Sequence, residues 1–279
     1  MKLISLLLII IPLVSCLDGI KPDQNLEKTL NSNEVLSTDI QAILDSSNVI
    51  GSILVYNVQN NNYYSNDFEW CRNGQLPAST FKITNSIIAL ETGVVQNDST
   101  VFKWNGETRR NKNLEQDLTL KEAFHYSCLP CYQDIAKHIG VEKMKKYIEL
   151  LEYGHIEVDS STLENFWLIG NSHINQFEQI EFLKRLYESN LPISKRTETI
   201  MKRMIIQEEN ETFKISGKTG WSYTNKIDNG WFVGYVEVNK NIYYFATNIT
   251  PKTGFDIHVF PAVRKAVTYD SFKALGILH

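Results

Sequence analysis

The sequence has no run of like charges and no basic stripe, so it gives little support to a nucleic-acid-binding function. Lysine and arginine number 28 against 32 aspartate and glutamate, a net charge of −4. No repeat of fixed period and no low-complexity tract is present. The chain has 279 residues, of which 43% are hydrophobic. This length and composition suit one large globular domain or one domain with an inserted lobe.

The apolar run at the N-terminus, Leu3–Leu13, is too short to span a bilayer and follows one positive residue, Lys2. This build is typical of a signal peptide, so we expect residues 1–15 to be removed. The run ends in LVSC, which resembles a bacterial lipobox and makes Cys16 the lipid-bearing first residue of the mature chain. The alternative is an ordinary secretory signal followed by a chance cysteine.

Polar residues short of aromatics follow, and we interpret residues 16–40 as a tether and 41–279 as the folded domain. Strands are predicted at 51–58, 212–220, 230–238 and 241–249, with turns at 60–62 and 239–240, and a closing helix at 260–278. The middle, roughly 85–205, is mostly helical in pattern. The expected fold class is α/β: an antiparallel sheet built from both chain ends, flanked by helices, with an inserted and mostly helical lobe.

The stretch PASTFKIT begins a predicted helix over 77–90 and combines a serine with a lysine. Ser79 and Lys82 are three residues apart, so they face the same way on a helix. A serine hydroxyl is a weak nucleophile unless a base removes its proton. Lysine serves as that base only when it is neutral, which an apolar pocket favours by desolvation. The alternative is a helix-capping serine beside a lysine that extends to solvent.

A Lys-Thr-Gly sequence occurs twice, and together with Ser-x-x-Lys it belongs to the motif set of serine β-lactamases and penicillin-binding proteins. The first copy, Lys218-Thr219-Gly220, ends a strand-like run and is followed by Trp221. A strand edge with bare glycine backbone lets a substrate pair with main-chain groups. The second copy, 252–254, follows a proline in a loop. We therefore take the first copy as functional and the second as chance.

From about residue 45 to its end, the chain resembles the class D (OXA-type) β-lactamases. The segments that carry the resemblance, in order, are PASTFKI (77–83), FWLIG (166–170), GKTGW (217–221) and GWFVGY (230–235). Each is weak singly, but their order and spacing are specific. The resemblance implies the fold of serine β-lactamases and penicillin-binding transpeptidases, with 41–279 as the catalytic domain.

The resemblance also implies roles for individual residues. Ser79 is the acylated nucleophile, and Ser127 of YSCLPCYQ relays a proton to the departing lactam nitrogen. The backbone N–H groups of Ser79 and Trp221 form the oxyanion hole, where losing one donor costs about 10²–10³ in rate in other acyl-transfer enzymes. Lys218, Thr219 and Arg264 hold the substrate carboxylate, for which a planar guanidinium suits two-pronged pairing.

For Lys82, the resemblance implies carboxylation by CO₂, giving a carbamate (N6-carboxylysine) that acts as general base in both acylation and deacylation. No other cofactor and no metal is implied. A buried carbamate needs hydrogen-bond donors, and Trp167 matches the family's tryptophan in that role. The alternative for Trp167 is an ordinary core aromatic.

Two positions depart from the family pattern. Leu129 stands where the family's second-serine motif usually ends in valine; it is expected to lie against the lysine and to affect access of CO₂ and water. His155 replaces asparagine in a Tyr-Gly-Asn segment, and we interpret it as an exposed loop histidine.

The cysteines allow several interpretations. Cys128 and Cys131 with His125 offer three possible metal ligands within seven residues, but this segment is already explained. A disulfide between the two cysteines is an alternative in an oxidising compartment, and we favour two small buried thiols. Cys71 has no obvious partner.

The resemblance implies hydrolysis of penicillin-type antibiotics through a serine acyl-enzyme, conferring resistance, in the bacterial periplasm or cell envelope. The only membrane association expected is a lipid anchor at Cys16, and the sequence leaves the oligomeric state open. The rivals are a β-lactam sensor, which acylates and stops, and a penicillin-binding transpeptidase. After residue 16 no further membrane span and no signalling domain is recognised, which argues against the sensor.

Overall fold

The computed structural model describes residues 31–279, so the predicted signal peptide and Cys16 lie outside the described residues. The elements in chain order are β1 (Glu34–Leu36), α1 (Thr38–Ser46), β2 (Val49–Asn57), β3 (Asn62–Ser65), α2 (Phe68–Arg72), η1 (Ala78–Phe81), α3 (Lys82–Glu91), β4 (Val101–Phe102), η2 (Lys112–Leu114), β5 (Leu118–Thr119), α4 (Leu120–His125), α5 (Leu129–Ile139), α6 (Val141–Leu151), α7 (Gln176–Tyr187), α8 (Lys195–Met204), β6 (Ile206–Glu209), β7 (Phe213–Thr224), β8 (Ile227–Val238), β9 (Asn241–Pro251) and α9 (Phe260–Ala274).

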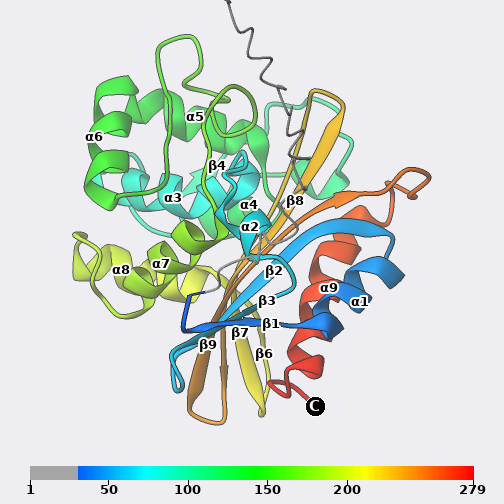
Figure 1. Ribbon diagram of the computed structural model, residues 1–279. Helices are drawn as coiled ribbons and strands as arrows, with labels where there is room; N and C mark the ends of the chain where they lie inside the picture. The colour runs from blue at the N-terminus through cyan, green and yellow to red at the C-terminus, as the bar shows by residue number, and fades with distance from the viewer. Residues whose placement is uncertain (1–30) are drawn as a thin grey trace, which may run out of the picture.

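Strands from both chain ends form one sheet in the order β1-β3-β2-β9-β8-β7-β6 (Figure 1). Its neighbours are antiparallel except for β1 and β3, which run parallel. The long strands β8 and β9 meet at the predicted turn, where Asn239 and Lys240 have φ of 51° and 65°. Positive φ at both central residues is what a two-residue hairpin turn requires. The predicted antiparallel sheet is therefore confirmed.

The two faces of the sheet bury two separate hydrophobic clusters. Strand side chains alternate between faces, so Ile53 and Val55 pack with α1 and α9, whereas Leu54 and Tyr56 pack with the helices of the lobe. Figure 1 shows α1 and α9 together on one side of the sheet and α3, α5, α6, α7 and α8 on the other. The central strands β8 and β9 are buried over most of their length because both of their faces are covered.

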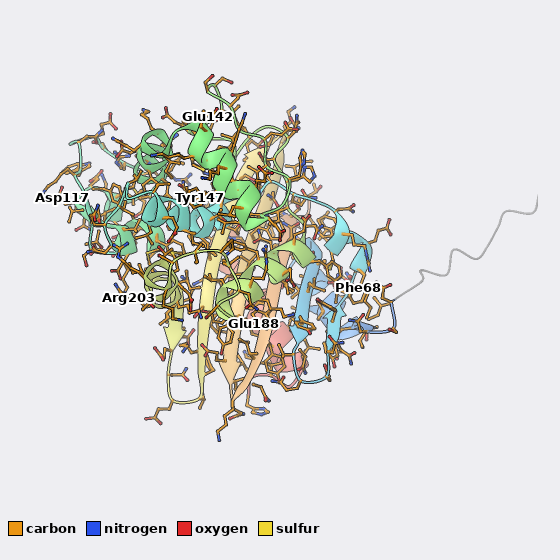
Figure 2. All side chains as sticks on the ribbon, turned by 90° about the vertical axis from the view of Figure 1, so that its left-hand side faces the viewer. Phe68, Asp117, Glu142, Tyr147, Glu188 and Arg203 are labelled. Atoms are coloured by element: carbon orange, nitrogen blue, oxygen red, sulfur yellow. A yellow bond between two sulfur atoms is a disulfide. The ribbon has the colours of Figure 1, made fainter. Side chains whose placement is uncertain are left out.

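The inserted lobe contains helices α3 to α8 and a small two-stranded pair, β4 and β5, which confirms the prediction of a mostly helical middle. Figure 2 looks onto the lobe, with Glu142 on α6 and Arg203 on α8 among its exposed side chains. Across residues 31–279, no helix is long and apolar enough to cross a membrane.

Two predicted boundaries are wrong. The tether was expected to reach residue 40, but β1 and the start of α1 lie within its last residues. The carboxylate of Glu34 pairs with the guanidinium of Arg72, and β1 pairs with β3, so distant partners order a polar segment. The helix expected over 77–90 begins as the 3₁₀ turn η1 and becomes α-helical only at Lys82. Ala78 has φ of 51°, which regular α-helix does not allow.

Candidate active site

Ser79 lies in η1, and this turn is held from two sides. The backbone N–H of Ala78 donates to the carbonyl oxygen of Trp167 in the lobe at 2.8 Å. On the sheet side, the carbonyl oxygen of Leu76 accepts from the indole N–H of Trp231 on β8, also at 2.8 Å. The lobe and the sheet together fix the backbone of the turn, while Ser79 itself stays half-buried and accessible.

Strand β7 passes directly beside this turn because Gly220 has no side chain. A Cβ atom at Gly220 would lie 3.2 Å from the carbonyl oxygen of Pro77 and 3.3 Å from the Cβ of Ala78. Both contacts are tighter than ordinary van der Waals packing, so a larger residue here would force strand and turn apart. The glycine of the first Lys-Thr-Gly copy therefore brings its strand to the serine.

Lys82 is the first residue of α3 and lies one turn after Ser79. Its Nζ donates to the Oγ of Ser79 at 3.2 Å and lies 4.8 Å from the ring centre of Tyr132. The side chain is buried, with 1% of the residue exposed. Burial lowers the pKa of Lys82 to about 7 because the ammonium loses its hydration. A neutral amine is therefore accessible near neutral pH, which is what a base for Ser79 requires.

Trp167 is buried and lies nearly parallel to Phe81, with 5.9 Å between the ring centres. Among residues 31–279, no acceptor is hydrogen-bonded to its indole N–H. A buried donor without a partner costs about 1–3 kcal/mol. Trp167 is thus part of the core and also carries a donor that an anionic group could satisfy.

Ser127 and Lys218 bring the lobe and the sheet into contact at the site. Ser127 lies in the turn between α4 and α5 with φ of 53°, and its Oγ accepts from the Nζ of Lys218 at 2.5 Å. Lys218 is buried on β7 and also donates to the carbonyl oxygen of Thr219 at 3.0 Å. Burial first, and then the charges of Lys82, Arg264 and Lys265, holds the pKa of Lys218 well below its ordinary value.

The outer edge of β7 is free beside Ser79. Strand β6 pairs with β7 only as far as Ser216, and the N–H of Gly217 then donates to the carbonyl oxygen of Ile205. Because a strand repeats every two residues, the N–H groups of Thr219 and Trp221 point to this same edge. No strand within residues 31–279 pairs with that part of the edge, so its backbone groups can receive an extended ligand.

Arg264, on α9, reaches the same strand from the opposite face of the sheet. Its guanidinium donates to the carbonyl oxygen of Gly220 and lies 5.9 Å from the ring centre of Trp221. Gly230 leaves room for it, since a Cβ there would lie 2.9 Å from the Cδ of Arg264. Burial lowers the pKa of Arg264 to about 10, so the group stays cationic at neutral pH.

The structure therefore brings together most of the residues that the sequence singled out: Ser79, Lys82, Trp167, Ser127, Lys218, Thr219, Gly220, Trp221 and Arg264. Leu129 begins α5 and packs, half-buried, against the core of the lobe. Two aromatic residues of the site were not predicted. Tyr132 lies over the Lys82 amine, and Phe124 has its ring centre 5.5 Å from the Lys218 amine. Nothing in their local sequence distinguishes them from other core aromatics.

Two other sequence features lie elsewhere. The second Lys-Thr-Gly copy is in the loop after β9, where Lys252 forms an ion pair with Asp45 on α1. His155 is an exposed loop histidine, as expected, 3.4 Å from the carboxylate of Glu157. Its backbone also pairs with that of His173.

The preference for two buried thiols at Cys128 and Cys131 is wrong, because the two sulfurs form a disulfide. Cys128 caps the N-terminus of α5 and Cys131 lies in its first turn, which sets their Cα atoms 5.4 Å apart, within the range that a disulfide spans. A sulfur in a disulfide is not a thiolate, so the alternative metal site with His125 loses two ligands. Cys71 is a buried free thiol that contacts the hydroxyls of Ser52 and Ser65.

Comparisons with known proteins agree with this geometry. Residues 42–268 match the family described as penicillin binding protein transpeptidase domain. The chain is 37% identical to β-lactamase OXA-48 of Klebsiella pneumoniae over 78% of this chain and 82% of that protein. It is 32% identical to the probable β-lactamase YbxI of Bacillus subtilis over 82% of each chain. The crystal structure of a class D β-lactamase from Sebaldella termitidis superposes with a TM-score of 0.84 at 34% identity, covering 89% of this chain and all of the other.

Replacing the buried Lys82 by Met should stabilise the fold, and by more at pH 7 than at pH 9. In the unfolded chain the amine has a pKa near 10.5, against about 7 in the fold. Below pH 7 both states are protonated and the fold bears the full desolvation cost; that cost fades as the pH rises toward 10.5. At up to about 1.36 kcal/mol per pH unit, the advantage of Lys82→Met should shrink by about 2 kcal/mol between pH 7 and pH 9, since the folded amine still binds half a proton at pH 7.

Denaturant unfolding in CO₂-free buffer at the two pH values measures this difference. Lys146→Met provides the matched control, because Lys146 is exposed on α6 and has no desolvation to relieve. A stability difference between wild type and Lys82→Met that does not change with pH would contradict the assignment of Lys82 as a desolvated amine.

Proposed function

The chain belongs to the class D β-lactamase family, and on that basis we propose that it opens the amide bond of penicillin-type β-lactams through an acyl-enzyme on Ser79. It is a serine β-lactamase, and hydrolysis of the lactam destroys the antibiotic and so supports resistance. The observation that carries the assignment of the nucleophile is the 3.2 Å contact between the Ser79 hydroxyl and a lysine amine that burial makes available in its neutral form.

During acylation, the residues on the lobe side and on the sheet side of the site have different roles. The proton of the Ser79 hydroxyl passes to the base at Lys82 as the oxygen attacks the lactam carbonyl. The N–H groups of Ser79 and Trp221 stabilise the charge that develops on the carbonyl oxygen. When the amide bond breaks, the lactam nitrogen takes a proton from the Ser127 hydroxyl, which the hydrogen-bonded Lys218 replaces. Before deacylation the proton taken up at Lys82 returns to Lys218; the freed base at Lys82 then takes a proton from the water that attacks the ester and passes it to the departing Ser79 oxygen.

The substrate carboxylate is assigned to the outer edge of β7, at Thr219, beside the side chains of Lys218 and Arg264. Arg264 stays charged at neutral pH, whereas its neighbourhood pushes Lys218 toward the neutral form. We therefore assign the lasting charge of the carboxylate site to Arg264 and the movable proton to Lys218. One branch of the guanidinium already donates to Gly220, which holds the group in position for the substrate.

The residues around Lys82 fit the carbamate that the family resemblance implies. CO₂ adds only to a neutral amine, and burial brings the pKa of Lys82 to about 7. A buried anion needs a donor, and the Trp167 indole N–H is buried with no partner among residues 31–279. When formed, the carbamate supplies the general base for both chemical steps. Trp167 would hold it by hydrogen bonding, and Tyr132 would limit its contact with water.

Turnover of a chromogenic cephalosporin tests the function itself. The protein should release many product molecules per chain, because a hydrolase regenerates its serine. Mass spectrometry after β-lactam exposure should locate the acyl adduct on Ser79, and Ser79→Ala should carry none. A single product molecule per chain would indicate a sensor or a transpeptidase, and an adduct on another serine would overturn the assigned nucleophile.

Loss of CO₂ should lower activity if Lys82 works as a carbamate. Activity should fall after degassing or at mildly acidic pH, and added bicarbonate should restore it. Trp167→Phe keeps the ring but removes the N–H donor. A hydrogen bond to a charged group is worth about 1.5–3 kcal/mol, so this variant should need about 10- to 150-fold more bicarbonate for half-maximal activity.

Trp104→Phe is the matched control, because the Trp104 indole N–H donates to the carbonyl oxygen of Glu107 in an exposed loop. Its bicarbonate requirement should equal that of wild type. Full activity of the degassed enzyme, together with no carbamate signal in a carbon-13 bicarbonate NMR spectrum, would exclude the carbamate even if Ser79 is the nucleophile.

We also propose that the protein works in the bacterial periplasm or cell envelope, held to a membrane by a lipid on Cys16. This rests on the LVSC sequence alone, since Cys16 precedes the described residues. Wild-type protein expressed with its N-terminal segment should partition into the detergent phase, and Cys16→Ser should be released in soluble form. Wild-type protein found wholly in the aqueous phase would contradict the anchor.

A further inference from the structure

The disulfide between Cys128 and Cys131 directly follows Ser127 in the chain. Cys128 caps the N-terminus of α5, and Cys131 lies in the first turn of that helix. The sequence of the bridge, Cys-Leu-Pro-Cys, is a Cys-x-x-Cys arrangement at a helix N-terminus, a setting that lowers the pKa of a thiol. Its sequence separation of only three residues places it at the low end of what a disulfide contributes to stability.

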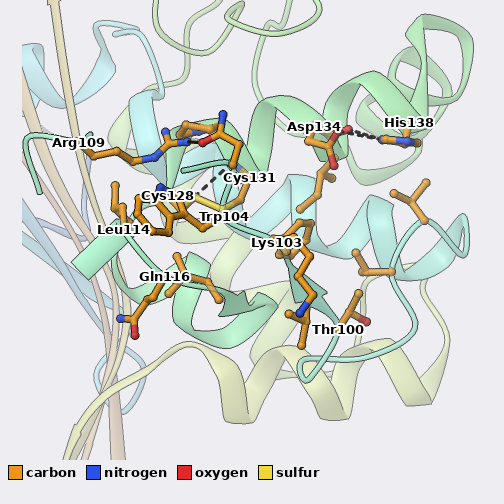
Figure 3. A pocket seen from close by; sticks show the side chains of 18 residues that line it. Thr100, Lys103, Trp104, Arg109, Leu114, Gln116, Cys128, Cys131, Asp134 and His138 are labelled. Carbon is orange, nitrogen blue, oxygen red and sulfur yellow. Dashed lines mark hydrogen bonds and ion pairs between the residues drawn. A yellow bond between two sulfur atoms is a disulfide. The ribbon is translucent and has the colours of Figure 1, made fainter. Parts of the chain in front are cut away.

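The bridge faces a cavity of about 390 Å³ in the lobe, and none of the residues that line this cavity belongs to the candidate active site (Figure 3). Trp104, Leu114 and Asp134 line this cavity together with both cysteines. Cys128 is 3% exposed, whereas Cys131 is only partly buried. A small thiol entering the cavity would therefore meet the sulfur of Cys131 first.

The two sulfurs are also chemically unequal. The backbone N–H of Cys131 donates to the Sγ of Cys128 at 3.3 Å, and the N-terminal end of α5 adds its positive dipole. A leaving thiolate that is stabilised in this way departs faster in thiol–disulfide exchange. Accessibility and leaving-group stability thus select the same reaction, in which a thiolate attacks Cys131 and expels Cys128.

The backbone between the bridge and the site is constrained. Ser127 has φ of 53°, a conformation unusual for a residue with a side chain, and its N–H donates to the carbonyl oxygen of Phe124 at 3.2 Å. Its hydroxyl meets Lys218 at 2.5 Å. The covalent bond between Cys128 and Cys131 fixes the residue next to Ser127 onto α5, and so limits how far this turn relaxes.

We propose that the Cys128–Cys131 bridge is a positioning element for Ser127 that small dithiols open through the cavity and that their cyclic disulfides close by the reverse exchange. This inference rests on the function proposed above. One thiolate of the dithiol bonds to Cys131 and the Cys128 thiolate leaves. The second thiol then attacks this mixed disulfide and releases Cys131. The dithiol is oxidised to its cyclic disulfide, and both protein cysteines end as thiols with the protons that the dithiol gave up.

Opening the bridge should slow proton delivery to the lactam nitrogen. Dithiothreitol-treated wild type should lose about tenfold or more in acylation rate, since a positioned general acid contributes 10²–10⁴-fold. The deacylation rate and the number of active sites measured by acyl titration should stay unchanged, whereas a merely destabilised protein would lose active sites. Cys131→Ser should show the same slow acylation with or without the dithiol.

Cys71→Ser is the matched control, because Cys71 is a buried thiol outside the site. It should acylate at the wild-type rate and respond to the dithiol as wild type does. Mass-spectrometric mapping of a thiol label shows whether the bridge has opened. A bridge that resists the dithiol in the folded protein, or an unchanged acylation rate after mapped reduction, would overturn this inference alone. Absence of turnover by the oxidised wild type would overturn the proposed function as well.

Discussion

The removal of water from around the Lys82 amine is the constraint on which the site depends. Most surface helices keep one polar face, but in α3 every residue from Lys82 to Leu90 is buried. This helix is buried within the lobe, so the side chain of a lysine at its first position cannot extend into bulk solvent. The fold thereby disfavours the ammonium and brings the pKa near 7, beside a serine hydroxyl 3.2 Å away.

The same burial makes the lysines and the arginine of the site differ in how firmly they hold their charge. Burial favours the neutral form of Lys82, and burial first, followed by the neighbouring charges, also lowers the pKa of Lys218. Arg264 retains its charge because a guanidinium starts from a much higher pKa and reaches the site from the other face of the sheet. The site therefore contains two lysines that can exchange protons and one arginine that stays cationic. Among residues 31–279, no carboxylate is paired with Lys82 or Arg264. That separation suits the chemistry of an anionic amide substrate.

The sequence predicted the sheet, the helical lobe and the members of the site, because each depends on local pattern or on motifs with specific spacing. It could not predict features that distant segments impose. The strand β1 has only three residues, too few for a recognisable pattern, and exists because it pairs with β3. The 3₁₀ turn at Ser79 arises where Trp167 and Trp231 fix a backbone with positive φ at Ala78.

The disulfide shows the same limit from another direction. A three-residue spacing allows two thiols, two metal ligands or a bridge, and helix geometry in the folded chain decides between them. The aromatic rings over the two lysine amines were likewise invisible, since Tyr132 and Phe124 read as ordinary core residues. The roles of the site residues in catalysis stay predictions.

Several unfavourable features of the molecule lie where the lobe meets the sheet. They are the positive φ of Ala78 and of Ser127, the Trp167 N–H without a partner among residues 31–279, and two desolvated lysines. Strained backbone and an unsatisfied buried donor each cost about 1–3 kcal/mol, so the surrounding structure must over-determine them. Separate hydrophobic clusters on the two faces of the sheet provide that support, and hydrogen bonds to Leu76 and Ala78 transmit it to the turn. Strained backbone and an unsatisfied donor therefore occur around the reactive serine, between two hydrophobic clusters that follow the ordinary rules of folding.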